Sequence, residues 1–186
     1  MTPFEHLAVF VSIVLGLSVT QLLASVHRLA VARSRVRFYW LPLLWVALIF
    51  VTQVEWWWAI YAMRQRTAWN FVYFLFVVLS PVSLYLAAAF ALPDVEPNTC
   101  VDLRESYYAN RGWFFGAVAV GPVLDAARRA TQAGTWRDAG VVSNLVSAAM
   151  VATLAVSRRP AYHAAVTLSV AALFLAFIAQ SAFELR

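Results

Sequence analysis

The sequence contains little charge, no lysine and almost no cysteine. Only 12% of the 186 residues are charged, and the 14 basic residues are all arginine, which is typical of a GC-rich genome and favours a bacterial source. Cys100 is the single cysteine, so an internal disulfide and a cysteine-based metal cluster are both excluded. The arginines lie mostly between the apolar stretches, where topology and lipid headgroups require them. The net charge of +5 therefore predicts no nucleic-acid partner.

The sequence also lacks the motifs of known reactions. GxSxG, HExxH, a phosphate-binding P-loop and a paired-carboxylate signature are missing, so hydrolase, metalloprotease and nucleotide-driven functions have no support. An enzyme that acts on lipid headgroups through scattered arginine and aspartate side chains stays open. His27 and His163 are predicted on one membrane side, but without His-rich spacing they favour interfacial histidines over a haem or metal site. We expect no cofactor and no metal, and we favour a protein that is not an enzyme.

Long apolar runs dominate the chain instead. Hydrophobic residues make up 63% of the sequence and the mean hydropathy is +0.73, more than one soluble core requires. A bilayer core about 30 Å thick takes about 20 apolar residues per helix. The sequence predicts an all-α integral membrane bundle of six transmembrane helices, one domain over residues 1–186 with the lipid bilayer as partner. The expected helices are 7–27, 38–62, 68–92, 107–127, 139–157 and 161–183, with a polar loop at 93–106.

The fourth predicted helix has the shortest apolar run. Only Gly112–Leu124 is uncharged between Arg111 and Asp125, which is too short to cross a bilayer. We expect this helix to recruit residues at both ends, with Arg111 reaching toward headgroups and Asp125 facing protein or water.

Arginine positions predict the orientation of the chain. Four arginines follow the first helix, whereas the N-terminal tail carries Glu5 and no basic residue, so the N-terminus is expected outside. Those arginines are Arg28, Arg33, Arg35 and Arg37. Because no basic region opens the chain, the first run is expected to be a retained helix rather than a signal peptide.

Three stretches carry a resemblance to a known group of proteins. They are PFEHLAVFVSIVLGLSVTQLL, RVRFYWLPLLW followed by WWW, and DLRESYYANRGWFF. The chain resembles, over these stretches, a widespread set of small bacterial multi-span proteins of unknown function. The resemblance implies a location in the bacterial inner membrane and brings no activity or functional residue with it.

Glu55 is the leading candidate for a functional group. Ionisable side chains inside a membrane are costly and are often functional. At 100° per residue Glu55 shares a helix face with Thr52 and Trp45, next to Gln53. We predict an intramembrane polar cluster of Glu55, Thr52, Gln53, Asp125 and Arg128, in which Glu55 lies near Arg128 or, failing that, Arg64 or Arg66. The alternative is that Glu55 reaches the interface beside the Trp56–Trp58 aromatic belt.

Small and polar residues mark further helix faces. Ser18, Gln21 and Ser25 line one side of the first helix and are candidates for a cavity lining. Ser12, Gly16 and Thr20 lie on another side and favour close helix packing. Gly112 and Gly116 have GxxxG spacing, which favours packing within the chain or between subunits. These surfaces predict a homo-oligomer, with a homodimer as the first expectation.

Two functions remain open on the sequence. The first is a channel or carrier for a small ion, a proton or another polar solute, suggested by Glu55, Asp125 and the Gln21 face. The second is a non-catalytic scaffold or sensor subunit that acts through helix packing. A water-filled path to Glu55 would favour the first function, and a dry, packed interior with polar faces turned outward would favour the second.

Overall fold

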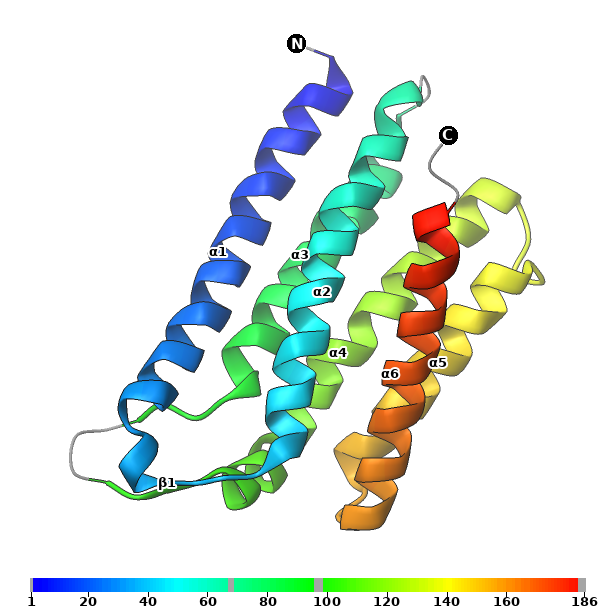
Figure 1. Cartoon of the computed structure of the whole chain (residues 1–186). Coiled ribbons are helices and arrows are strands. Elements are labelled where there is room, and N and C mark those ends of the chain that lie inside the picture. Colours follow the sequence, from blue (N-terminus) through cyan, green and yellow to red (C-terminus); the bar gives the residue numbers. More distant parts are fainter. Residues whose placement is uncertain (1, 67–68, 96–98, 184–186) are drawn as a thin grey trace.

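The computed structural model describes residues 2–66, 69–95 and 99–183. Six α-helices in these ranges run alternately up and down in one bundle (Figure 1), which confirms the all-α prediction. They are α1 (Pro3–Val31), α2 (Trp40–Ala62), α3 (Phe71–Ala91), α4 (Leu103–Ala133), α5 (Ala139–Val156) and α6 (Pro160–Phe183). Short 3-10 turns, η1 (Arg33–Arg35) and η2 (Met63–Gln65), follow α1 and α2. Two short strands, β1 (Val36–Arg37) and β2 (Val101–Asp102), pair in parallel.

Side-chain caps set the helix ends. At the start of α1, Thr2 and Glu5 form a capping box in which each side chain accepts the other's backbone N–H, at 3.2 and 2.9 Å. Asp102 caps α4 by accepting the N–H groups of the next turn. Gly134 ends α4 in the left-handed conformation at φ 65°, which glycine adopts without a steric penalty. These caps hold more residues in helix than apolar length alone predicts.

Two helices therefore extend beyond their predicted bounds. α1 covers 3–31 rather than 7–27, and α4 covers 103–133 rather than 107–127. The predicted polar loop at 93–106 is corrected at its end, because residues 103–106 already belong to α4. Residues 96–98 of that loop, and the predicted start of the third helix at residue 68, lie outside the described residues.

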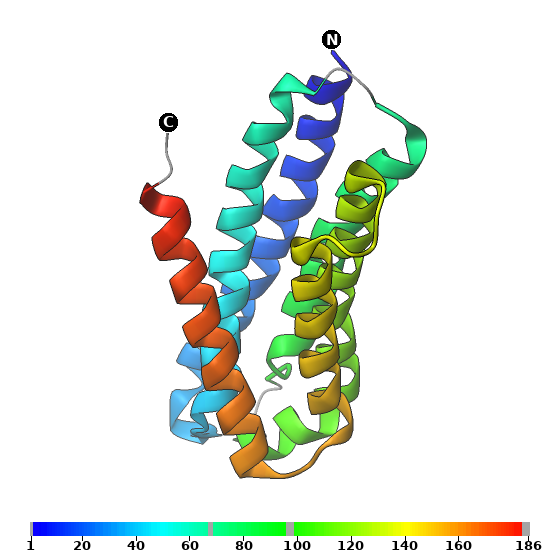
Figure 2. The same ribbon diagram turned by 90° about the vertical axis from the view of Figure 1, so that its right-hand side faces the viewer.

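Five of the described helices are long and apolar enough to cross a membrane: α1, α2, α3, α5 and α6. The chain is thus compatible with a multi-pass membrane protein. α4 does not meet this criterion because charged side chains interrupt it near both ends. It nevertheless runs from one end of the bundle to the other beside α3 and α5 (Figures 1 and 2). Its role as a sixth span stays a prediction.

The helices differ in how much they pack. α4 lies between α3 and α5 and contacts both along its length, and α1 packs on α3. α6 contacts the bundle mainly through its first half, where His163, Val166 and Thr167 are buried. None of the described side chains from residue 168 to 179 is buried, and Figure 2 shows this half of α6 leaning away from α5. Lipid or another chain must cover the free faces of this half.

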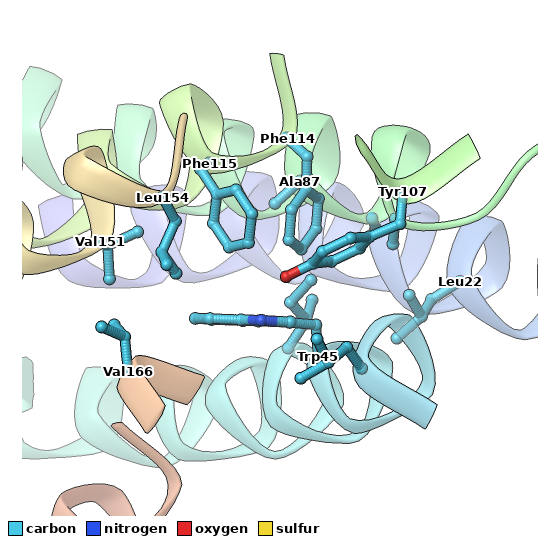
Figure 3. Packing of buried hydrophobic residues seen from close by; sticks show 13 residues of the cluster. Leu22, Trp45, Ala87, Tyr107, Phe114, Phe115, Val151, Leu154 and Val166 are labelled. Carbon is cyan, nitrogen blue, oxygen red and sulfur yellow. The ribbon is translucent and has the colours of Figure 1, made fainter. Parts of the chain in front are cut away.

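The two largest apolar clusters lie at different heights of the bundle. One surrounds Leu7, Val11 and Leu15 of α1 together with Tyr73 and Val77 of α3. The other is larger and is built around Trp45 of α2 and Phe114 and Phe115 of α4. Figure 3 shows this second cluster, with Phe114 and Phe115 facing the Trp45 indole and the Tyr107 hydroxyl pointing toward it. The rings meet edge to face, with Trp45 and Phe115 centroids 5.2 Å apart.

Candidate functional site

A network of charged side chains centres on Asp125, in the second half of α4. Its Oδ1 accepts hydrogen bonds from Arg128 Nε at 2.9 Å and from Arg128 Nη2. Its Oδ2 accepts from Arg129 Nε and from Asn144 Nδ2 of α5, each at 2.7 Å. The Asp125 and Arg128 side chains are only 21% and 13% exposed. Four N–H donors therefore satisfy the carboxylate and fasten α4 to α5.

Arg128 extends this network to α3. Its Nη1 donates to the Tyr73 hydroxyl at 3.4 Å and to Gln132 Oε1 at 3.3 Å, and Gln132 Nε2 donates to the same hydroxyl at 3.2 Å. The Tyr73 hydroxyl in turn donates to Met63 Sδ at 3.8 Å. The Arg66 guanidinium lies over the Tyr73 ring, 3.8 Å from its centroid. Charge, hydrogen bonds and an aromatic face thus join α3, α4 and the end of α2.

Glu55 of α2 faces this network as a half-buried carboxylate. It lies within electrostatic range of Asp125, Arg128 and Arg129. Among the described residues, no hydrogen bond reaches its carboxylate. Arg64, named from the sequence as an alternative neighbour, instead donates to the Tyr61 carbonyl and stacks on the Tyr61 ring. Glu55 is thus the acid of this region that lacks direct donors, whereas Asp125 has four.

Two residues predicted in the same cluster lie outside the network. Thr52 donates its hydroxyl proton to the Leu48 carbonyl at 2.8 Å, a bond within its own helix. Gln53 is 2% exposed and points to another side of α2, because two residues along a helix differ by about 200°. The prediction that grouped Gln53 with Glu55 is corrected accordingly, whereas Thr52 shares the Glu55 face of α2 and bonds within its own helix. Asp125 and Arg128 are joined directly, together with Arg129 and Asn144, and Glu55 lies within electrostatic range of Asp125 and both arginines.

Gln53 belongs to a polar layer between the two apolar clusters. On α1, Ser18 lies between Leu15 of one cluster and Leu22 of the other; on α3, Ser80 and Ser83 take the equivalent position. The Ser80 and Ser83 hydroxyls donate to carbonyls of their own helix. In contrast, neither the amide oxygen nor the amide nitrogen of Gln53, nor the Ser18 hydroxyl, has a partner among the described residues. Such groups cost about 1–3 kcal/mol each when buried unpaired.

The face of α1 that was predicted to line a cavity points into the bundle. Ser18 and Ser25 are buried and Gln21 is half-buried, so this face does point into the bundle. Ser25 accepts from Arg28, which also pairs with Asp94 at 3.3 Å.

The residues predicted for close packing are corrected, because they make no such contact within the chain. Ser12, Gly16 and Thr20 are exposed, as are Gly112 and Gly116. A Cβ atom placed on any of these three glycines would have no atom within 4 Å. Thr20 uses its hydroxyl in a bond to the Gly16 carbonyl. Packing between subunits is the remaining form of the prediction.

A second polar cluster, which the sequence did not reveal, surrounds His163 near the other end of the bundle. His163 is fully buried, and its Nε2 lies 3.1 Å from the Ser157 carbonyl oxygen. A carbonyl only accepts, so Nε2 carries the proton and Nδ1 accepts from the Tyr107 hydroxyl at 3.0 Å. Nearby, Trp45 Nε1 donates to Thr167 Oγ1 at 3.1 Å. The neutral imidazole in this tautomer has both ring nitrogens satisfied. In the sequence, the position of His163 within a largely apolar helix could have indicated that this side chain is buried.

Neither of two open hollows reaches the Glu55 region. Both lie at the end where α1 stops and α4 starts, with volumes of about 430 and 270 Å³. The larger is bordered by Arg35, Arg37, Cys100, Asp102 and Glu105. In the part of the chain that the structure describes, no group of three or more His, Cys, Asp or Glu side chains is arranged to hold a metal ion.

No protein-family model matches the chain, and the comparisons with curated proteins and with solved structures found no match. Any function must therefore be argued from the geometry of these clusters.

Proposed function

We propose that the chain is a multi-pass protein of a bacterial inner membrane that carries protons, with Glu55 as the group that takes up and releases them. The observation that supports this role is the half-buried Glu55 carboxylate, which faces the Asp125 network without a hydrogen bond from it. Ionisable groups inside membrane-spanning helices are expensive, and proton relays are a common reason for keeping them.

The charges of the network make Glu55 the group that can change state. Asp125 is fixed by four donors, so its protonation would break an established set of bonds. Arg128 and Arg129 carry two positive charges against one on Asp125. An ionised Glu55 brings the sum to zero, and a protonated Glu55 leaves one positive charge. The network is therefore neutral in one state and carries a single positive charge in the other.

A proton suits this site better than a metal cation or another cationic solute. Two guanidinium groups lie within electrostatic range of Glu55 and would repel a bound metal cation or cationic solute. A proton instead joins the carboxylate covalently and removes its charge.

Proton flux into liposomes tests the proposal. The purified protein is reconstituted with an encapsulated pH-sensitive dye, and a potassium diffusion potential drives protons inward. We expect Glu55→Gln to lower the protein-dependent flux at least about tenfold, a barrier change of about 1.4 kcal/mol, and Glu55→Asp to retain part of it. Glu105→Gln, at an exposed acid in the first turn of α4, is the matched control. The proposal fails if wild-type flux equals that of empty liposomes, or if Glu55→Gln conducts like wild type.

Orientation is part of this proposal. Eight arginines lie near the end of the bundle where α1 ends and α4 and α6 begin, and this basic end would face the cytoplasm. They are Arg28, Arg33, Arg35, Arg37, Arg104, Arg111, Arg158 and Arg159. Cys100, the only cysteine, is exposed at the same end. A membrane-impermeant thiol reagent should label it in inverted vesicles and not in intact cells; labelling in intact cells would reverse the orientation.

An assembly subunit is the second candidate function. The observation that favours it is the exposed small-residue faces of α1 and α4, where a Cβ atom on Gly16, Gly112 or Gly116 would meet no neighbouring element within 4 Å. We expect Gly16→Leu or Gly116→Leu to convert a homodimer to monomers in native mass spectrometry, with Gly134→Asn at the helix-ending turn as a control outside both faces. Dimers unaffected by either leucine variant would remove this candidate.

A further inference from the structure

We propose that the Gln53 amide and the Ser18 hydroxyl bind water in the middle of the bundle, and that this water is the central segment of the route by which protons reach Glu55. The second half of this inference rests on the proposed function. The water site itself does not.

The evidence for a ligand is a pair of buried side chains without partners. Gln53 is 2% exposed and Ser18 is fully buried, yet the amide oxygen, the amide nitrogen and the serine hydroxyl all lack a hydrogen bond within the described chain. Rotating the Gln53 amide by 180° only exchanges the positions of its oxygen and nitrogen, so both atoms still lack a partner. Buried polar groups are almost always satisfied by protein or by ordered water.

Two prolines remove helical N–H donors near this height. Pro81 lies inside α3 and Pro122 inside α4. A proline has no N–H, so the carbonyl four residues earlier loses its usual helical donor; these carbonyls belong to Val77 and Val118. Inside a membrane, interrupted backbone is tolerated where protein groups or water replace the missing bonds. α3 and α4 also approach closely here, since a Cβ on Gly121 would lie 3.5 Å from Ser83 Oγ.

The chemistry of the unpaired groups selects water among small ligands. The amide nitrogen needs an acceptor, whereas the amide oxygen and the backbone carbonyls need donors. A metal cation would serve the oxygens and leave the nitrogen unpaired. Water donates and accepts, and a buried water makes about three such bonds.

The position of this layer gives the water its role. Ser18 begins an inward-facing polar line on α1 that continues through Gln21 and Ser25 to Arg28, at the basic end. Two residues beyond Gln53 on α2, Glu55 faces the Asp125 network toward the other end. In the layer between these two regions, Ser80 and Ser83 bond to carbonyls of their own helix, whereas the Gln53 amide and the Ser18 hydroxyl have no partner among the described residues. Because Gln53 and Glu55 point to different sides of α2, water bound at Gln53 would connect the two regions by passing around this helix.

Magnetisation transfer from water to side-chain amides tests the site directly. The chain has five glutamines, so selective nitrogen-15 labelling of glutamine side chains in nanodiscs gives few signals, and Gln53→Met identifies that of Gln53. We expect strong transfer from water to the Gln53 amide. The exposed Gln132 amide is the positive control. In a second sample labelled with nitrogen-15 on tryptophan, the buried Trp45 indole N–H, which donates to Thr167, is the dry control. A Gln53 amide as dry as Trp45 overturns the inference.

Proton flux tests the role of the water. Gln53→Met should lower the flux about tenfold and Ser18→Ala by less, whereas Gln53→Asn, which keeps an amide, should restore most of it. Ser143→Ala, at an exposed serine of α5, is the matched control and should conduct like wild type. Circular dichroism and size-exclusion chromatography check that each variant folds. Wild-type flux in Gln53→Met, with Glu55→Gln inactive, overturns the route and leaves the proposed function standing. Wild-type flux in Glu55→Gln overturns the proposed function, and the water transfer still decides the site.

Discussion

The polar clusters around Asp125 and around His163 satisfy buried groups in different ways. Asp125 is ionised and takes four N–H donors, two of its neighbours being guanidinium groups. His163 is neutral, and one hydroxyl and one carbonyl complete its bonds. The Asp125 side chain is 21% exposed, whereas His163 is fully buried. The charged groups lie where water can still approach them, whereas the polar groups beside the buried aromatic rings form hydrogen bonds between neutral partners.

The comparison explains why the two clusters hold the bundle differently. Ionic hydrogen bonds tie α4 to α5 at Asn144 and to α3 at Tyr73. The neutral cluster ties α6 to α4 through Tyr107 and to α2 through the Trp45–Thr167 bond. Hydrogen bonds to charged groups are about twice as strong as neutral ones. Consistent with this, α5 packs extensively on α4, whereas α6 is buried only in its first half among the described residues.

Removing the charge of Asp125 should give the largest loss of stability. Asp125→Asn leaves Arg128 largely buried without its counterion, and such losses cost about 3 kcal/mol. Unfolding in mixed detergent micelles, followed by circular dichroism, measures the change.

Asp94→Asn is the matched control for this prediction. Asp94 also pairs with an arginine, Arg28, but its side chain is 90% exposed, so its loss should cost less than about 1 kcal/mol. Equal costs for the two variants would show that burial does not distinguish the pairs, and would contradict the comparison.

The apolar runs made most of the fold predictable. Each long run became a helix, because the length of an apolar stretch and the lack of water decide helix formation in a bilayer. The ends of α1 and α4 were harder to predict, since Thr2, Asp102 and Gly134 fix them through local bonds rather than hydropathy. Apolar length is a property of many residues, whereas a cap depends on one or two.

The site was predictable in part. Counting spans placed Glu55 and Arg128 on one side of the membrane, and the structure brings them near each other. The same counting could not give the direction of Gln53, because a shift of two residues turns a side chain to another face. It also could not pair Tyr107 with His163, which are 56 positions apart and meet only after α4 and α6 have packed.

Removing the Tyr107 hydroxyl should give an intermediate effect. Tyr107→Phe preserves the ring contacts and leaves the buried Nδ1 of His163 without a donor, a loss of about 1–2 kcal/mol. The same unfolding measurement applies. Tyr162→Phe, which breaks the exposed contact between Tyr162 and Thr153, should change stability by less than about 0.5 kcal/mol. A loss for Tyr107→Phe as large as that for Asp125→Asn would mean that neutral bonds hold this bundle as strongly as ionic ones.

The smallest effect concerns a third acid, Asp102, which lies at the end of the bundle near Tyr107 but outside its membrane-spanning helices. The backbone N–H of Glu105 holds the pKa of the Asp102 carboxyl below its ordinary value of 3.8, and the N–H of Arg104 and the charge of Arg37 add to this. A lowered pKa in the folded state means that the stabilisation is complete above the ordinary value and is lost as pH falls through the folded value. The stability gap between wild type and Asp102→Asn should therefore stay constant from neutral pH down to about 4 and close below it. Thermal unfolding across this pH range measures the gap. Because the first cause is a backbone N–H, Arg37→Gln should retain most of the pH dependence; if it abolishes that dependence, the ion pair at 3.7 Å would dominate instead, and this end of the bundle would depend on charge as Asp125 does.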